Sequence, residues 1–276
     1  MGTDAPRDKV RSVESAFVDR GAAFCEQLLR QCGKKILLAR SGVGEVKSGW
    51  VGGQYKHPGD VVAHEFLSKA IWEFFPDIPV VSEEDSNSIA RQFERYFIID
   101  PIDGTASFAQ GFPGWVTQIA YVQNGMAEFA GVYAPVTNEY FEAIRTRGAY
   151  RNKQRLQVVG GQALNILIDN YPEPRGVAEE AFNGLGISSY VESGSIGLKI
   201  CRVADNTANL FLKLMSPRDW DLAAPMLILE EAGGVITNAH GERYLLGVGE
   251  RCHDGLIATN CRANLDRVTA WLDSRK

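Results

Sequence analysis

The stretch from Tyr96 to Phe108 constrains the fold of this chain more than any other, because a strand pattern, a proline and two aspartates follow one another there. Tyr96 to Ile99 is a β-branched and aromatic run, which is typical of a buried strand. Pro101 lacks the N–H donor that strand pairing needs, so we expect the pairing to end there. The sequence therefore predicts a buried strand that carries Asp100 at its end.

Asp100 and Asp103 have side chains that strict strand alternation would point to opposite faces. They can converge only if the backbone bends between them, which Pro101 and Gly104 permit. Thr105 begins the pattern of a first helical turn, whose free N–H groups and positive dipole attract an anion such as phosphate. A hard cation between the carboxylates would reconcile them with an anion site, since Mg²⁺ binds carboxylate and carbonyl oxygens and bridges them to phosphate. Asp-Pro-x-Asp-Gly is also a good turn sequence, and that interpretation stays open on spacing alone.

Two further acidic segments lie far from this stretch along the chain. They are Ser82-Glu83-Glu84-Asp85 upstream, and Trp220-Asp221-Leu222-Ala223-Ala224 followed by Glu230-Glu231-Ala232-Gly233-Gly234 downstream. The three segments, in this order and in a chain of 276 residues, resemble the inositol monophosphatase superfamily of metal-dependent, lithium-sensitive phosphatases. The resemblance spans nearly the whole chain. It implies a layered αβαβα fold of class α+β / α/β, with the site in a cleft between two lobes.

The resemblance also implies a set of metal ligands. These are Glu83, Asp100, the backbone carbonyl of Ile102, Asp103 and Asp221, with Glu84 in support of its neighbour. They would hold two or three Mg²⁺ ions per site, and Mn²⁺ would substitute. Four carboxylates carry a charge of −4, which two divalent ions cancel. Without metal, such a cluster repels both itself and an anionic substrate.

The resemblance further implies that a metal-activated water attacks phosphorus without a covalent enzyme intermediate. Thr105 and Asp60 would orient this water, and the N–H groups near Gly104 and Thr105 would hold phosphate oxygens. Asp60 is equally a plausible helix N-cap before Val61 to Phe75, because Asp is favoured at that position. Asp221 is likewise a normal N-cap residue, a role that is compatible with metal binding.

The motifs point to more than one substrate. Asp-Pro-Ile-Asp-Gly-Thr-x-Ser-Phe is similar to inositol and histidinol phosphatases, whereas Gly194 to Cys201 and Pro217 to Ala224 are similar to the 3'(2'),5'-bisphosphate nucleotidase branch. Inositol monophosphatases usually carry a glutamate seven residues before the Trp-Asp aspartate, and this chain has Leu214 there. That departure weakens the inositol interpretation.

Three residues are candidate substrate contacts on this basis. They are Ser195, Lys199 and Arg218. Lys199 and Arg218 could pair with a second phosphate, since guanidinium forks suit phosphate oxygens and an ammonium supplies a point charge. Alternatively, Lys199 is a surface side chain on a helix and Arg218 pairs with Asp219.

The sequence therefore favours a Mg²⁺-dependent phosphomonoesterase that acts on a small phosphorylated metabolite. Its first-ranked substrate is adenosine 3',5'-bisphosphate, and inositol 1-phosphate is the alternative. A histidinol or sugar phosphate is a further alternative within the same class of enzyme. A non-catalytic binding protein on the same fold is the remaining one, although the intact set of acidic residues argues against it.

Composition excludes several other classes of protein. The net charge of −5 and the scattered Lys and Arg residues give no support to nucleic-acid binding. The charged N-terminus and the lack of a long apolar run predict a cytoplasmic protein without a membrane anchor. Five cysteines without Cys-x-x-Cys spacing argue against a disulfide framework and a zinc site. The family commonly dimerises, which implies a homodimer.

The pattern of apolar residues divides the chain into two lobes, 1–150 and 151–276. The first is predicted to contain helices over Lys9 to Arg40 and Val61 to Phe75, joined by a mobile glycine-rich loop from Ser41 to Gly59. A short strand is predicted at Ile78 to Ser82. The later strands of this lobe are predicted to form an antiparallel sheet, and they are Val116 to Gln123, Ala127 to Tyr133 and Glu139 to Ile144. The second lobe alternates strands (Ala163 to Asp169, Ser189 to Glu192, Asn209 to Lys213, Gly255 to Thr259) with helices (Gly176 to Leu185, Gly197 to Asp205, Leu222 to Ala232, Ala263 to Ser274).

Overall fold

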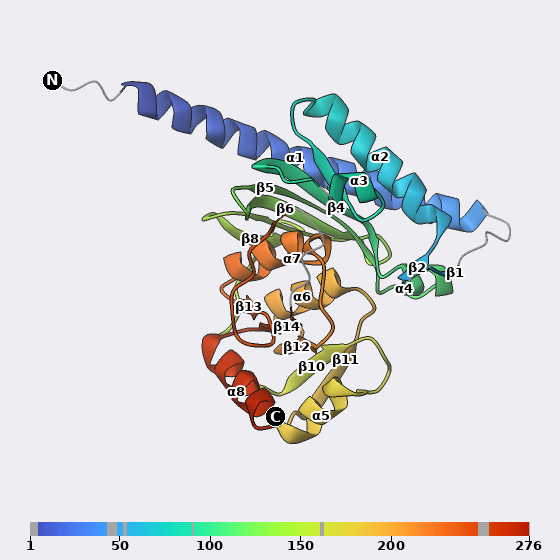
Figure 1. Ribbon diagram of the computed structural model, residues 1–276, viewed down its shortest axis with the longest axis vertical. Helices are drawn as coiled ribbons and strands as arrows, with labels where there is room; N and C mark the ends of the chain where they lie inside the picture. The colour runs from blue at the N-terminus through green and yellow to red at the C-terminus, as the bar shows by residue number, and fades with distance from the viewer. Residues whose placement is uncertain are drawn as a thin grey trace.

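The computed structural model describes residues 5–42, 49–51, 54–89, 91–160, 163–247 and 254–275. They form five layers, in which two sheets alternate with three layers of helices (Figure 1). The outer layer at one end holds α1 (Ala5–Gly42) and α2 (Pro58–Phe74), the middle layer α6 (Ile196–Ala204) and α7 (Asp219–Glu231), and the other outer layer α5 (Val177–Gly184) and α8 (Arg262–Asp273). The predicted αβαβα fold is confirmed.

The first sheet has seven strands, in the order β3-β4-β5-β6-β7-β8-β9. Their bounds are β3 (Val80–Ser82), β4 (Arg95–Asp103), β5 (Val116–Gln123), β6 (Met126–Ala134), β7 (Glu139–Ile144), β8 (Gly148–Arg151) and β9 (Gln154–Leu156). Only β3 and β4 pair in parallel, and the remaining neighbours are antiparallel. The predicted hairpin-linked strands are therefore present, and β8 and β9 extend the sheet beyond them.

The second sheet has five strands, in the order β11-β10-β12-β14-β13. Their bounds are β10 (Ile166–Asp169), β11 (Ser189–Glu192), β12 (Leu210–Lys213), β13 (Val235–Thr237) and β14 (Leu256–Thr259). β10 pairs in parallel with both β11 and β12, so the carboxyl ends of these three strands lie at one edge of the sheet. The sequence indicated four of these strands and missed β13.

Alternation along β4 and β5 explains how the first sheet packs on both faces. Phe97 and Ile99 belong to the core under α1 and α2. Tyr96 and Ile98 belong to the core shared with α6, α7 and the second sheet. The side chain of Asp100 continues this second series, so it points toward the middle helical layer.

The remaining described elements are short. A hairpin of β1 (Gly49–Val51) and β2 (Gln54–Lys56) lies within the stretch predicted as a loop, of which residues 43–48 and 52–53 fall outside the described part. α3 (Ser86–Ile89) and α4 (Thr105–Gln110) complete the set. Four of the cysteines, Cys25, Cys32, Cys201 and Cys261, are free thiols, and Cys252 is outside the described residues.

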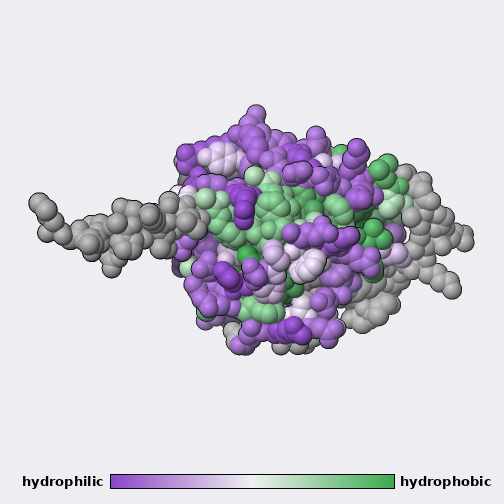
Figure 2. Space-filling model, turned by 90° about the horizontal axis from the view of Figure 1, so that it is seen from above, coloured by the Kyte–Doolittle hydropathy of each residue, from purple (hydrophilic) through white to green (hydrophobic). Residues whose placement is uncertain are grey.

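The surface over α1 and α2 carries an apolar area among hydrophilic side chains (Figure 2). Exposed apolar side chains of these two helices include Leu38, Val61, Val62, Trp72 and Phe74. None of the described helices combines the length and hydrophobicity that a membrane span needs.

Candidate metal centre

A β-bulge brings Asp100 and Asp103 to the same face of the first sheet. β4 does not end at Pro101, as the sequence led us to expect, but continues to Asp103. Asp100 pairs with Gln118 and Asp103 with Val116, so the register shifts between them by one extra residue in β4. That residue exchanges the two faces, which places Ile102 in the core under α1 and α2 and turns Asp103 toward the middle helices.

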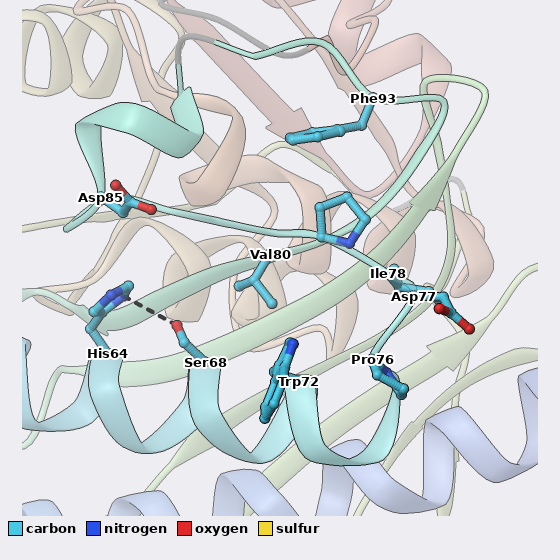
Figure 3. Close-up of a pocket in the computed structure, with 10 residues that line it drawn as sticks. His64, Ser68, Trp72, Pro76, Asp77, Ile78, Val80, Asp85 and Phe93 are labelled. Atoms are coloured by element: carbon cyan, nitrogen blue, oxygen red, sulfur yellow. Dashed lines mark hydrogen bonds between the residues drawn. The ribbon is translucent and has the colours of Figure 1, made fainter.

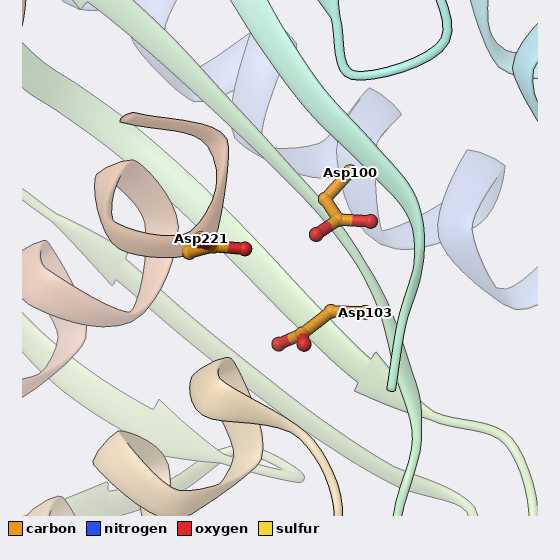
Figure 4. A group of neighbouring side chains, drawn as sticks. All are labelled: Asp100, Asp103 and Asp221. Atoms are coloured by element: carbon orange, nitrogen blue, oxygen red, sulfur yellow. The ribbon is translucent and has the colours of Figure 1, made fainter. Parts of the chain in front are cut away.

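Asp221 reaches the same point from α7. One carboxylate oxygen from each of Asp100, Asp103 and Asp221 lies within 4.8 Å of the other two (Figure 4). The structure therefore brings together three of the predicted metal ligands from positions that are far apart in the chain. Carboxylate oxygens at this spacing are the kind of ligand that hard divalent cations prefer.

The N-terminus of α6 fixes the carboxylate of Asp103. The Ser195 hydroxyl and the Gly197 N–H both donate to Oδ2 at 2.6 Å, and the Ile196 N–H donates to Oδ1 at 3.2 Å. Ser195 also caps the helix, because its Oγ accepts from the Leu198 N–H at 2.9 Å. Sequence analysis named Ser195 as a substrate contact and missed the two backbone donors, although a Gly-Ser-x-Gly run before a helix is a usable signal for them.

Asp60 and Asp221 occupy equivalent positions in their helices. Asp60 Oδ2 accepts from the His57 N–H at 2.9 Å, and Asp221 Oδ2 accepts from the Arg218 N–H at 2.7 Å. Both are the third residue of the helix and reach back to the capping residue, as in a capping box. The expectation that each is itself the N-cap is wrong, because α2 begins at Pro58 and α7 at Asp219.

Burial and charge repulsion raise the pKa of two carboxyls in this cluster. Burial and the charges of Glu83, Asp103, Asp221 and Asp60 raise the pKa of Asp100 well above its ordinary value. Burial, followed by the charge of Asp103, raises the pKa of Asp221 to about 7. Asp100 Oδ1 is buried and has no hydrogen-bond partner among the described residues. A buried acceptor without a donor, among acids that repel one another, fits a bound cation.

These pKa shifts predict how the metal-free protein responds to pH. The folded protein binds the Asp221 proton more tightly than the unfolded chain does, so the free energy of unfolding should fall as pH rises from about 4 to about 7. A divalent cation should abolish this fall, because it takes the place of the proton. Urea unfolding in EDTA and in Mg²⁺, at about pH 5 and about pH 8, checks this. Metal-free stability that increases over this range would contradict the cluster.

Thr105 links the strand end to α2. Its Oγ1 lies 3.2 Å from Asp60 Oδ1 and 2.9 Å from the carbonyl oxygen of Ile102. Asp60 is buried, and Gly104 adopts the left-handed conformation at φ +90° immediately before α4. A Cβ at Gly104 would lie 3.0 Å from the Gly114 carbonyl oxygen, so a larger residue would be strained there. The structure thus joins Asp60, Thr105 and Ile102, and their roles stay predictions.

Glu83 and Glu84 lie in the turn after β3. The charge of Glu83 contributes to the raised pKa of Asp100, although its carboxylate is not part of the group within 4.8 Å. The Glu84 N–H donates to Ser82 Oγ at 3.3 Å, and His64 Nδ1 lies 2.8 Å from the same oxygen. Their assignment as ligand and supporting residue stays a prediction.

His64 belongs to an open cavity of about 550 Å³ behind this turn (Figure 3). Figure 3 shows His64, Ser68 and Trp72 along one side of α2, facing the strand that carries Val80. Asp100, Asp103 and Asp221 do not line this cavity.

The environment of Lys199 differs from the surface position that was one of the two sequence alternatives. Its side chain is 1% exposed, so it is not a surface side chain. Its Nζ lies 3.8 Å from Asp169 Oδ1, donates to Asn170 Oδ1 and sits 4.7 Å from the centre of the Phe211 ring. Burial lowers the pKa of Lys199 to about 8. A contact with a second phosphate would require its amine to leave these partners.

Arg218 and Leu214 lie near the beginning of α7. Arg218 is the N-cap residue, next to the helix turn that carries Asp221. Leu214 is 48% exposed, immediately after β12. The interaction of Arg218 with a phosphate stays a prediction.

Comparison with known proteins gives a family match over most of the chain. The model of the inositol monophosphatase family matches residues 22–272. The relative named Nus factor SuhB from Vibrio cholerae is 33% identical over 195 residues, which are 67% of this chain and 73% of the relative. The relative named fructose-1,6-bisphosphatase/inositol-1-monophosphatase from Thermotoga maritima is 32% identical over 187 residues, which are 66% of this chain and 71% of the relative.

Solved structures agree on the fold. An inositol monophosphatase of Thermotoga maritima superposes with a TM-score of 0.76 at 26% identity, covering 90% of this chain and 94% of that chain. The extragenic suppressor protein SuhB of Bartonella henselae superposes with a TM-score of 0.77 at 24% identity, covering 89% of this chain and 95% of that chain.

Proposed function

Because this chain belongs to the inositol monophosphatase family, we propose that it is a divalent-metal-dependent phosphomonoesterase acting on a small phosphorylated metabolite. The observation that supports this most strongly is the convergence of Asp100, Asp103 and Asp221 within 4.8 Å, beside the Thr105 and Asp60 pair. A site that only binds a cation would need no more than the three carboxylates. The additional pair of the Thr105 hydroxyl and the buried Asp60 carboxylate is what hydrolysis by a water molecule would use.

Cations held by the three aspartates, with Glu83 and the Ile102 carbonyl beside them, would neutralise the carboxylates and act as Lewis acids toward water and the phosphate ester. Thr105 would orient the attacking water through its hydroxyl, and Asp60 would accept the water proton. The backbone N–H groups at Gly104 and Thr105 would bind the phosphate oxygens. The bond from the water oxygen to phosphorus would form, the ester phosphorus–oxygen bond would break, and the departing alkoxide would take up a proton from solvent water.

A phosphorylated polyol or sugar is the substrate class that we place first. The Thermotoga maritima relative at 32% identity is named after two substrates of this kind. The second-phosphate contact that favoured adenosine 3',5'-bisphosphate depends in part on Lys199, whose amine is buried against Asp169 and Asn170. Arg218 keeps the nucleotide as the second substrate to test.

A factor that does not depend on hydrolysis is the second candidate function. The relative from Vibrio cholerae at 33% identity is named Nus factor SuhB, and that name refers to no substrate. A protein in that role would not need the contact between Asp60 and Thr105. The two candidates therefore differ in whether the purified chain turns over a phosphate ester.

Phosphate release with and without Mg²⁺ tests the proposal. The substrates are inositol 1-phosphate, fructose 1,6-bisphosphate and adenosine 3',5'-bisphosphate. We expect Mg²⁺-dependent release from at least one of them, and Asp60→Asn should lower kcat by about 10²-fold because it removes the proton acceptor. The exposed Asp77→Asn is the matched control and should be unaffected. No release from any of these esters would favour the non-hydrolytic factor.

A further inference from the structure

Gln118 is a buried polar residue that the assignment of ligands does not use. It lies in β5 directly opposite Asp100 of β4, so the two side chains point to the same face of the sheet. Its side chain is 1% exposed. A neutral amide is unusual here, because the other β5 residues on this face, Val116, Ala120 and Val122, belong to the apolar core.

The amide of Gln118 contacts α7 at the residue before Asp221. Its Nε2 donates to the Trp220 carbonyl oxygen at 2.9 Å, across 102 positions of sequence. Trp220 lies in the first turn of α7, and the side chain of Asp221 projects from the next residue. This hydrogen bond therefore ties the N-terminal turn of α7 to the strand beside Asp100.

The other end of the amide lies against α6. A Cβ built on Gly197 would be 2.5 Å from Gln118 Oε1 and 3.0 Å from Asp103 Oδ2. Glycine at this position therefore lets the amide approach the helix turn whose Gly197 N–H holds Asp103. Gln118 Oε1 is buried and has no hydrogen-bond partner among the described residues. Such an acceptor is rare in a folded protein unless something else satisfies it.

We propose that Gln118 is a positioning residue of the metal centre. The Gln118 side chain lies beside Asp100. It donates a hydrogen bond to Trp220, the residue before Asp221, and packs on Gly197, whose N–H binds Asp103. It sets the spacing of the three carboxylates by fixing the N-termini of α6 and α7 on the first sheet. Residues that orient ligands in this way typically change metal affinity 10–100-fold when they are removed. This inference rests on the proposed metal site, but its test does not require turnover.

Direct Mn²⁺ binding measured by titration calorimetry tests this role. Gln118→Met keeps the size of the side chain and removes both polar atoms. We expect Mn²⁺ to bind it about 10–100-fold more weakly than the unaltered protein, and the half-saturating Mg²⁺ concentration for phosphate release to rise by a similar factor. With saturating Mg²⁺, kcat should stay within a few-fold of the original. Gln123→Met, at the far end of the same strand, is the matched control and should bind Mn²⁺ normally.

Gly197→Ala probes the same contact from the helix side if the methionine variant folds poorly. Its added Cβ should displace Gln118 and weaken Mn²⁺ binding, and Gln118→Ala in the same chain should add little to the loss, because both changes disrupt the same contact. Unchanged Mn²⁺ affinity in Gln118→Met, or fully additive losses in the double variant, would overturn the role of Gln118. If the unaltered protein binds Mn²⁺ but releases no phosphate, the proposed function is overturned. The Mn²⁺ titrations of the variants still decide the positioning role of Gln118.

Discussion

Replacing Asp103 by asparagine should lower kcat/KM for phosphate release by about 10²–10³-fold or more, because it removes a charged ligand at the point where transition-state charge develops. The folded structure should be nearly unaffected. An asparagine oxygen can still accept from the Ser195 hydroxyl and the Gly197 N–H, which both bind Oδ2 in the unaltered protein. Loss of the negative charge at the α6 N-terminus costs stability, and relief of repulsion with Asp100 and Asp221 offsets it.

Steady-state kinetics and thermal unfolding of the same preparation separate these effects. Asp77→Asn removes an exposed carboxylate from outside the cluster and should match the unaltered protein in both assays. An Asp103→Asn variant with activity within a few-fold of normal would contradict its assignment as a ligand. A variant that fails to fold would show that the negative charge of Asp103 at the α6 N-terminus is needed for stability.

Asp100→Asn should have opposite effects on stability and on activity. Burial and four neighbouring carboxylates raise the pKa of Asp100, so the metal-free protein is destabilised when this group ionises. Asparagine keeps the shape and removes the charge, and we expect the metal-free protein to gain on the order of 2 kcal/mol. Phosphate release should fall by about 10²-fold or more, and the stabilisation by Mg²⁺ should largely disappear.

Asp169→Asn is the matched comparison for this gain. Asp169 faces the buried amine of Lys199 at 3.8 Å, so its removal leaves a buried cation without its carboxylate. That variant should lose stability where Asp100→Asn gains it. Urea unfolding of both variants in EDTA and in Mg²⁺ provides the measurement. Destabilisation of the metal-free protein by Asp100→Asn would contradict the picture of an uncompensated acidic cluster.

Periodicity and turn signals were sufficient to predict most of the secondary structure. β5, β7 and β11 have the bounds that alternation and turn residues indicated. The helix starts were less well predicted, because a capping residue such as His57 or Arg218 carries little signal of its own. β8, β9 and β13 are too short for a period to be recognised, and their pairing depends on neighbours elsewhere in the sheet.

The sequence predicted which acidic residues the structure would bring together, but not how the backbone arranges them. The order of the acidic motifs pointed to Asp100, Asp103 and Asp221, which the structure brings together. Pro101 indicated the end of a strand, whereas the tertiary pairing with β5 makes it part of a bulge. The burial of Lys199 and the contacts of Gln118 depend on how α6 and α7 pack between the two sheets. This packing cannot be predicted from a local sequence pattern.

The location of the metal is the most direct test of this account. Crystals grown with Mn²⁺ should show anomalous density between the carboxylates of Asp100, Asp103 and Asp221, with further density on the side of Glu83. Crystals grown in excess Mn²⁺ that show no manganese at these carboxylates, or manganese bound only elsewhere, would contradict it.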